Sequence, residues 1–195
     1  MFYMKKTELL RRTHAAFKAL GDWIETLPDD VLFFKPEPAV WSIAENLEHL
    51  NISLNQSTLA LRLPKILLKW MGGKSVPRAI YSYDELVAAY QQKLQEGGRA
   101  TGKYVPQETG NRNTLITAWL YESARYEEAL MRKWHEADLD SFFVPHPLLG
   151  RISIRELSYF TLYHTGHHFR IMQERRESTP VVSAMTDVVT IIQTS

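Results

Sequence analysis

The sequence contains no cysteine and no long hydrophobic run. Disulfide bonds, zinc–thiolate sites and a cysteine nucleophile are therefore excluded, and any metal ion must bind nitrogen or oxygen ligands. No segment approaches the roughly 20 apolar residues needed to cross a bilayer. The N-terminal segment also lacks the apolar core of a signal peptide. A cysteine-free chain fits a reducing compartment, so we expect a cytoplasmic protein.

An excess of either charge is also missing. The chain has 23 Lys and Arg residues against 22 Asp and Glu residues, a formal net charge of +1. This balance predicts neither the basic stripe of a nucleic-acid-binding protein nor the polybasic patch of a membrane-bound one. We expect no nucleic acid and no membrane as partner. Because 45% of the 195 residues are apolar, the chain has enough apolar side chains to form one hydrophobic core. We therefore expect a single domain over 1–195.

Four long segments carry the apolar periodicity of helices, over about residues 5–27, 42–63, 112–135 and 153–177. Ser42 and Ser153 each precede a Glu by three residues, which predicts capping boxes at the starts of two helices. Pro64 should end or kink the second helix. With no convincing strand pair in the sequence, the pattern predicts an all-α, up-down four-helix bundle.

Two further segments lie outside this bundle pattern. Residues 65–110 form an insertion between the second and third helices, with a shorter helix expected from Ser82 to the glycine pair at 97–98. Residues 179–195 are β-branched and polar without a helical stripe, and we interpret them as a C-terminal arm. The five tryptophans and nine tyrosines are many for a small bundle to cover, which favours a homodimer.

Two histidines stand out on the last helix. His164 and His168 are one turn apart and fall within one apolar stripe, so both should face the core. A pair at this spacing can reach one metal ion. The alternative is a pair of core histidines that are each satisfied by a hydrogen bond, and these residues alone leave both interpretations open. His167 falls toward the flank of the stripe and should point away.

A third ligand is harder to find from periodicity. His49 lies about 120° from the centre of the apolar stripe of the second helix, so the pattern alone is equally typical of a surface residue. Glu45 could orient His49, although its part in the capping box is the stronger interpretation. Glu122, between apolar positions of the third helix, is a candidate catalytic base; a solvated flank position is the alternative. The remaining histidines lie on a polar face, at a helix end and in a loop: His14, His135 and His146.

Three motifs carry a resemblance to a known family. They are WSIAENLEHL at residues 41–50, HPLLGRISIREL at 146–157 and YHTGHH at 163–168. In this order they resemble the DinB-like (YfiT-like) metalloenzyme superfamily, across nearly the whole predicted bundle. The resemblance implies a metal triad of His49, His164 and His168. One position departs from the pattern, since many relatives carry Gln where this chain has Ile171.

The resemblance also implies a range of chemistry. The expected cofactor is a divalent metal ion, zinc or nickel, that activates water or a small-molecule thiol. The expected activity is that of a hydrolase or of a thiol-dependent S-transferase. The partner would be a small-molecule substrate, and any low-molecular-weight thiol must come from outside a chain that has no cysteine. The alternative is a non-catalytic, metal-binding protein associated with stress or DNA damage.

Overall fold

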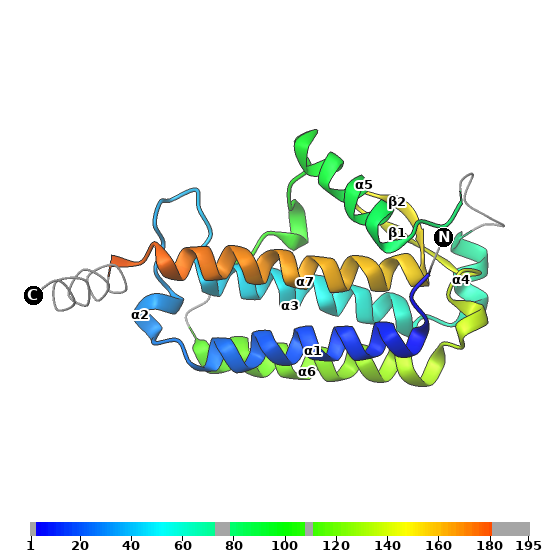
Figure 1. Ribbon diagram of the computed structural model, residues 1–195, viewed down its shortest axis with the longest axis horizontal. Coiled ribbons are helices and arrows are strands. Elements are labelled where there is room, and N and C mark those ends of the chain that lie inside the picture. Colours follow the sequence, from blue (N-terminus) through cyan, green and yellow to red (C-terminus); the bar gives the residue numbers. More distant parts are fainter. Residues whose placement is uncertain (1–2, 73–78, 108–110, 181–195) are drawn as a thin grey trace, which may run out of the picture.

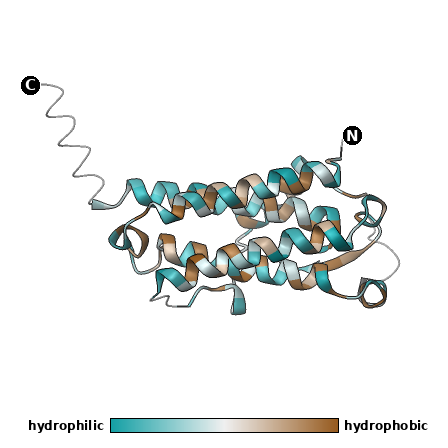
Figure 2. Ribbon diagram, turned by 90° about the horizontal axis from the view of Figure 1, so that it is seen from below, coloured by the Kyte–Doolittle hydropathy of each residue, from teal (hydrophilic) through white to brown (hydrophobic). Residues whose placement is uncertain are grey.

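The computed structural model describes residues 3–72, 79–107 and 111–180. Its four long helices are α1 (Lys6–Glu25), α3 (Ile43–Arg62), α6 (Arg112–Lys133) and α7 (Ile154–Glu177), and they form one bundle (Figure 1). Each carries apolar and polar positions along its length (Figure 2). The all-α four-helix bundle is therefore confirmed, with boundaries within two residues of those predicted. The expected arm falls almost wholly on residues 181–195, outside the described ranges.

The starts of three helices follow from their sequences. Ser42, Ser82 and Ser153 each accept a hydrogen bond from the backbone N–H of a Glu three residues later, and each of those glutamates bonds back to the backbone of the serine. Each capping box satisfies two N–H groups that a helix start leaves without partners. The capping boxes predicted at Ser42 and Ser153 are thus confirmed. Pro64 follows Leu63, the C-cap residue of α3, and separates α3 from α4 (Lys65–Gly72).

The helices do not simply alternate in direction along the chain. Asn51 on α3 donates to the carbonyl of Leu115 near the start of α6, and Trp134 just after α6 donates to that of Leu61 near the end of α3. The two helices therefore run parallel, and both run opposite to α1 and α7 (Figure 1). This order differs from a simple up-down bundle because the connection over residues 63–111 is long enough to return the chain to its starting end.

That connection lies at one end and along one side of the bundle, and a hairpin lies beside it (Figure 1). It holds α4, α5 (Tyr83–Gln95) and the short 3-10 helix η1 (Gly102–Tyr104), and α5 packs on α7 (Figure 1). The helix expected after Ser82 is confirmed, whereas α4 was not predicted. Strands β1 (Phe143–His146) and β2 (Gly150–Ser153) pair antiparallel before α7. The sequence did not predict them because of Pro145; a two-stranded hairpin tolerates proline, since each strand has a free edge.

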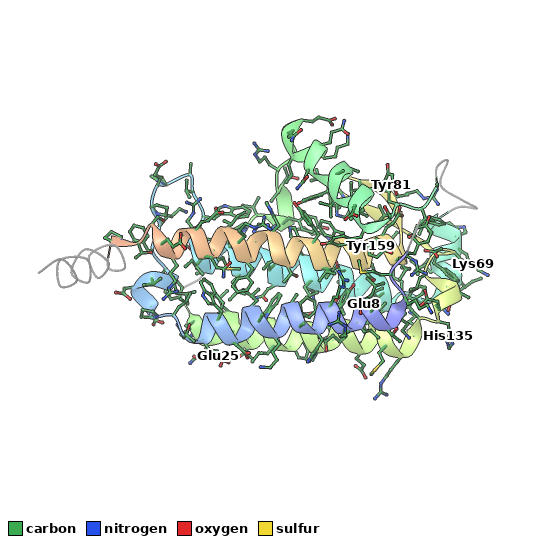
Figure 3. The ribbon with its side chains drawn as sticks, viewed as in Figure 1. Glu8, Glu25, Lys69, Tyr81, His135 and Tyr159 are labelled. Carbon is green, nitrogen blue, oxygen red and sulfur yellow. The ribbon has the colours of Figure 1, made fainter. Side chains whose placement is uncertain are left out.

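A buried arginine fixes the start of α7. Arg155 is 4% exposed, and its guanidinium pairs with Asp140 at 2.7 Å and Glu136 at 2.8 Å. Tyr159, labelled in Figure 3, accepts a hydrogen bond of 2.9 Å from the backbone N–H of Met4. The ion pairs tie the start of α7 to the segment after α6, and the Tyr159 bond ties α7 to the residues just before α1. Among the described residues, no helix is long and apolar enough to cross a membrane.

Candidate metal centre

Helix α7 presents two of the predicted histidines to the inside of the bundle. His164 and His168 are 4% and 7% exposed, and their ring centroids lie 4.6 Å apart. One turn of helix separates them, so their side chains leave the same face of α7. His167 is half-buried and, contrary to the expectation that it points away, lines the same cavity; its ring stacks on Tyr163 at 5.8 Å, and it is not part of the group of converging histidines.

Helix α3 supplies the third histidine, although its apolar stripe did not place it inward. His49 is 6% exposed because α3 is covered on several sides, by α6, by α7 and by η1. Many polar residues of α3 are buried for the same reason. The apolar stripe therefore marks only part of the buried surface of α3. The pattern allowed a surface position for His49, whereas the structure shows that His49 is buried.

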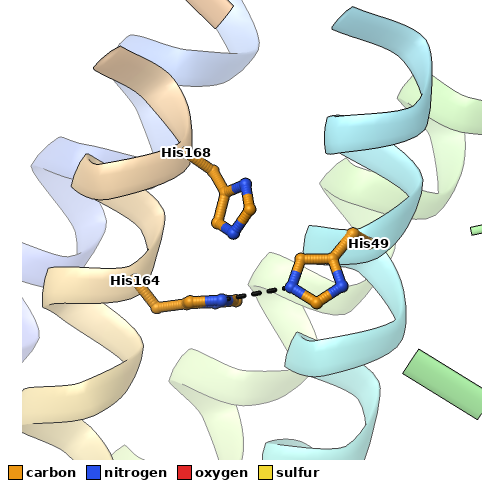
Figure 4. A group of neighbouring side chains, drawn as sticks. All are labelled: His49, His164 and His168. Atoms are coloured by element: carbon orange, nitrogen blue, oxygen red, sulfur yellow. Dashed lines mark hydrogen bonds between the residues drawn. The ribbon is translucent and has the colours of Figure 1, made fainter. Parts of the chain in front are cut away.

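The three rings converge on one point (Figure 4). One nitrogen of each of His49, His164 and His168 lies within 4.8 Å of the others. The Nε2 atoms of His49 and His164 are 3.2 Å apart. A tetrahedral ion with bonds of about 2.0–2.1 Å to nitrogen holds its ligands about 3.3 Å apart. The spacing of this pair therefore already matches shared coordination of one ion.

One backbone oxygen and one side-chain oxygen fix how two of the three rings are protonated. The Nδ1 atom of His49 lies 2.7 Å from the carbonyl oxygen of Tyr104, and that of His168 lies 2.8 Å from Oδ1 of Asn46. Both oxygens can only accept, so each Nδ1 carries the proton and each Nε2 keeps its lone pair. Asn46 is itself oriented by donating from Nδ2 to the carbonyl of Ser42 at 2.8 Å. This is the outer-shell arrangement of histidine metal ligands.

Burial keeps the three imidazoles neutral. Removal from water lowers the pKa of His49, and lowers that of His164 and of His168 well below the ordinary value. The neighbouring imidazoles lower the pKa values further, because two imidazolium ions would repel each other. Neutral imidazole is the form that binds a metal ion, so the donor set suits a divalent cation at neutral pH.

Removing the Asn46 acceptor should weaken metal binding without removing a ligand. We expect Asn46→Leu to lower the affinity for zinc by about 10–100-fold, the usual cost of losing such an orienting group. Asn46→Asp keeps an acceptor oxygen, so this variant should keep most of the wild-type affinity for zinc. Calorimetric titration with zinc measures the change. Asn51→Leu is the control, since Asn51 is buried on the same helix but bonds to Leu115; an equal loss there would contradict the assignment.

A cavity of about 580 Å³ adjoins the triad. All three triad histidines line it, and so do Trp41 and Phe160. The Phe160 ring stacks on His164 at 4.8 Å, and the Trp41 ring lies 5.1 Å from that of His49. An ion on three imidazoles would keep a coordination position open toward this space, as catalytic sites do and structural sites do not.

The two carboxylates considered from the sequence lie elsewhere. Glu122 is 8% exposed and so not solvated, but it lines a separate cavity between α3 and α6, where Asn55 and Arg125 bond to it at 2.9 Å. The structure does not bring Glu122 to the triad, so it gives no support to its role as catalytic base there. Glu45 serves the capping box and pairs with Lys35 at 2.7 Å.

Several residues of the site were not predicted from the sequence. Asn46 lies three residues before His49, and that spacing on a buried helix was a usable signal. Tyr104 contacts His49 through its backbone carbonyl, so the pattern of side chains in the sequence could not indicate it. His146 is the last residue of β1 and not a loop residue, and it lines the cavity; its Nδ1 accepts hydrogen bonds from the backbone N–H groups of Leu148 and Leu149. Burial lowers the pKa of His146 to about 4.

Comparison with known proteins agrees with this picture. The sequence profile described as the DinB superfamily matches residues 9–172. None of the curated proteins compared matches the sequence. The structure is similar to YfiT from Bacillus subtilis, with a TM-score of 0.56 and 16% identity over 87% of this chain and 85% of that one. That protein is described as a probable metal-dependent hydrolase with an unusual four-helix bundle topology. With most of its length matched by the superfamily profile, the chain belongs to the DinB superfamily.

Proposed function

We propose that this protein is a metal-dependent hydrolase acting on small molecules, with a divalent cation, zinc or nickel, held by His49, His164 and His168. The observation that carries the proposal is the convergence of three buried, neutral imidazoles at the wall of an open cavity. Such an ion lowers the pKa of a bound water toward 7 and polarises a carbonyl group. The description of YfiT as a probable metal-dependent hydrolase supports the same class of activity.

The protein's own residues supply binding and orientation in this proposal. Tyr104 and Asn46 hold two rings with their lone pairs directed inward. Trp41 and Phe160 place apolar rings against His49 and His164, which lowers the local polarity and strengthens electrostatic interactions at the triad. The described residues offer no fourth protein ligand, and the cavity is not filled by aromatic side chains. Both features favour an enzyme over a non-catalytic metal protein.

Thiol-dependent S-transfer is the second candidate, and one observation favours it. Among the described residues that line the cavity there is no Asp or Glu. Hydrolysis often uses a carboxylate as general base, whereas a thiol bound to a metal ion is deprotonated without one. Because the chain has no cysteine, the thiol would be a small-molecule cosubstrate.

An activity comparison separates these functions. The protein is stripped with a chelator and reloaded with zinc, nickel, cobalt or manganese, then assayed with small esters and amides, and with electrophiles plus low-molecular-weight thiols. We expect turnover only in the reloaded protein and none in His164→Ala. Turnover of esters without thiol supports the hydrolase, and turnover only with thiol supports the transferase. Stoichiometric metal binding without turnover in either panel would contradict both and favour the non-catalytic alternative.

We also propose that the protein is a homodimer. Helix α6 exposes three large apolar side chains, Leu120, Tyr121 and Met131, which are 52%, 60% and 54% exposed. Leu120 and Met131 are eleven residues apart and so share one face of the helix. Such a face is a candidate for an interface core. Light scattering should give the mass of two chains, and Leu120→Lys should reduce it to one; a wild-type mass of one chain would contradict the proposal.

A further inference from the structure

The walls of the triad cavity carry charge of one sign. Arg99 and Arg175 line it, and no carboxylate does so among the described residues. Neutral imidazoles do not offset the charge of an ion, so a divalent ion on the triad would keep its charge of about +2. Cations without compensating anions in a partly enclosed space raise the local concentration of an anionic ligand. The charges along the cavity therefore favour a negatively charged ligand.

Arg175 is placed to meet such a ligand. It follows His168 by seven residues on α7, which is two helical turns, so both leave the same face about 10 Å apart along the axis. Its Nε atom is buried and has no hydrogen-bond partner in the described part of the chain. A buried N–H without a partner is costly, and for a guanidinium the matching partner is an oxyanion. The lining residue Ile171 lies between them, so no polar group on this face intervenes.

Arg99 reaches the same cavity from the insertion. Its Nη1 donates to the backbone carbonyls of Leu94 at 3.1 Å and Gly98 at 2.7 Å, which hold the side chain in place. Carbonyl oxygens do not neutralise a guanidinium, and neither Arg99 nor Arg175 forms an ion pair with a carboxylate in the described ranges. The two arginines therefore come from different segments and face one cavity with their charges uncompensated.

We infer that the substrate carries a carboxylate or phosphate group, which Arg175 binds with help from Arg99 while the reacting part of the molecule lies at the triad. This inference rests on the proposed function, because it assigns the substrate class of the same site. An oxyanion accepts two parallel N–H bonds from one guanidinium, which fixes its orientation as well as adding affinity. Because Arg175 lies two helical turns after His168 on α7, the structure favours molecules whose acidic group is separated from the reacting centre over ones in which the two coincide.

The test uses cobalt-loaded protein and matched pairs of probes. ω-Mercapto acids of three to six carbons are compared with their neutral amides, and the thiolate–cobalt absorption band reports binding. At one chain length we expect the acid to bind about 10-fold more tightly or better than its amide. Arg175→Gln should remove that preference and leave the cobalt stoichiometry unchanged, whereas Arg175→Lys should keep part of it. Arg176→Gln is the matched control, since Arg176 is the next residue and is exposed.

A second arm is independent of the metal. Glutarate and inorganic phosphate are titrated calorimetrically into metal-free wild type and Arg175→Gln, and the two probes distinguish a carboxylate from a phosphate site. We expect one of them to bind wild type at least 10-fold more tightly than the variant. Equal binding of acid and amide at every length, or equal effects of Arg175→Gln and Arg176→Gln, would overturn the inference while leaving the proposed function intact. Failure to bind cobalt would instead contradict the proposed function, and the anion titration would then decide this inference alone.

Discussion

Replacing any one triad histidine by alanine is expected to abolish stoichiometric metal binding. His49, His164 and His168 each direct one ring nitrogen to a common point, so each substitution removes one of three ligands. The loss in affinity should exceed the 10–100-fold that removal of an orienting partner costs. Elemental analysis after dialysis against a weak chelator measures the metal content, and titration with zinc measures the affinity. Circular dichroism shows that each variant remains folded.

His167→Ala is the control for this experiment. His167 is the sequence neighbour of His168 and is only half-buried, but it stacks on Tyr163 outside the converging group. Its removal should leave the metal content at one ion per chain. Undiminished binding by His49→Ala would show that the triad is wrong, and equal losses in His164, His167 and His168 variants would mean that the ligand pair on α7 must be reassigned.

Trp119→Ala should strongly lower the free energy of unfolding. Trp119 is 1% exposed, packs edge-to-face on Phe17 with 5.2 Å between ring centroids, and donates from its indole to the carbonyl of Phe17 at 3.2 Å. Truncating a buried tryptophan typically costs about 3–5 kcal/mol, because transfer free energy is lost and a cavity remains. Urea unfolding followed by circular dichroism measures the free energy of unfolding.

Trp70→Ala provides the comparison for the core substitution. Trp70 is 83% exposed, so its removal should change the free energy of unfolding by no more than about 0.5 kcal/mol. Because Trp119 lies between α1 and α6 and does not line the triad cavity, the folded variant should still bind one metal ion per chain. A loss below about 1 kcal/mol for Trp119→Ala would contradict the packing described for this core.

The parts of the fold that were predictable depend on local chemistry. Ser42 and Ser153 with their glutamates set two helix starts through bonds that span only three residues. His164 and His168 were placed inward because α7 has a clear apolar stripe. The parallel run of α3 and α6 was not predictable, since helical periodicity carries no information on direction. The hairpin was missed because Pro145 lowers strand propensity, and only its edge position makes it acceptable.

The parts of the site that were not predictable depend on contacts between distant segments. His49 appeared off the stripe because burial of α3 comes from three neighbours on different sides. The carbonyl of Tyr104 lies 55 residues from His49, in an insertion with no pattern to mark it. Glu122 looked like a catalytic candidate from its spacing, yet α6 directs it into a cavity on another side of α3. Resemblance to relatives supplied His49 where periodicity could not.

We expect above all that the three histidines bind one metal ion at the wall of the cavity. A crystal structure of the zinc-loaded protein, with anomalous data collected on both sides of the zinc absorption edge, tests it most directly. We expect a single strong anomalous peak within about 2.0–2.1 Å of one nitrogen from each of His49, His164 and His168, with its remaining coordination open to the cavity. A fully occupied zinc ion on other residues, or a carboxylate in place of any of the three imidazoles, would contradict it.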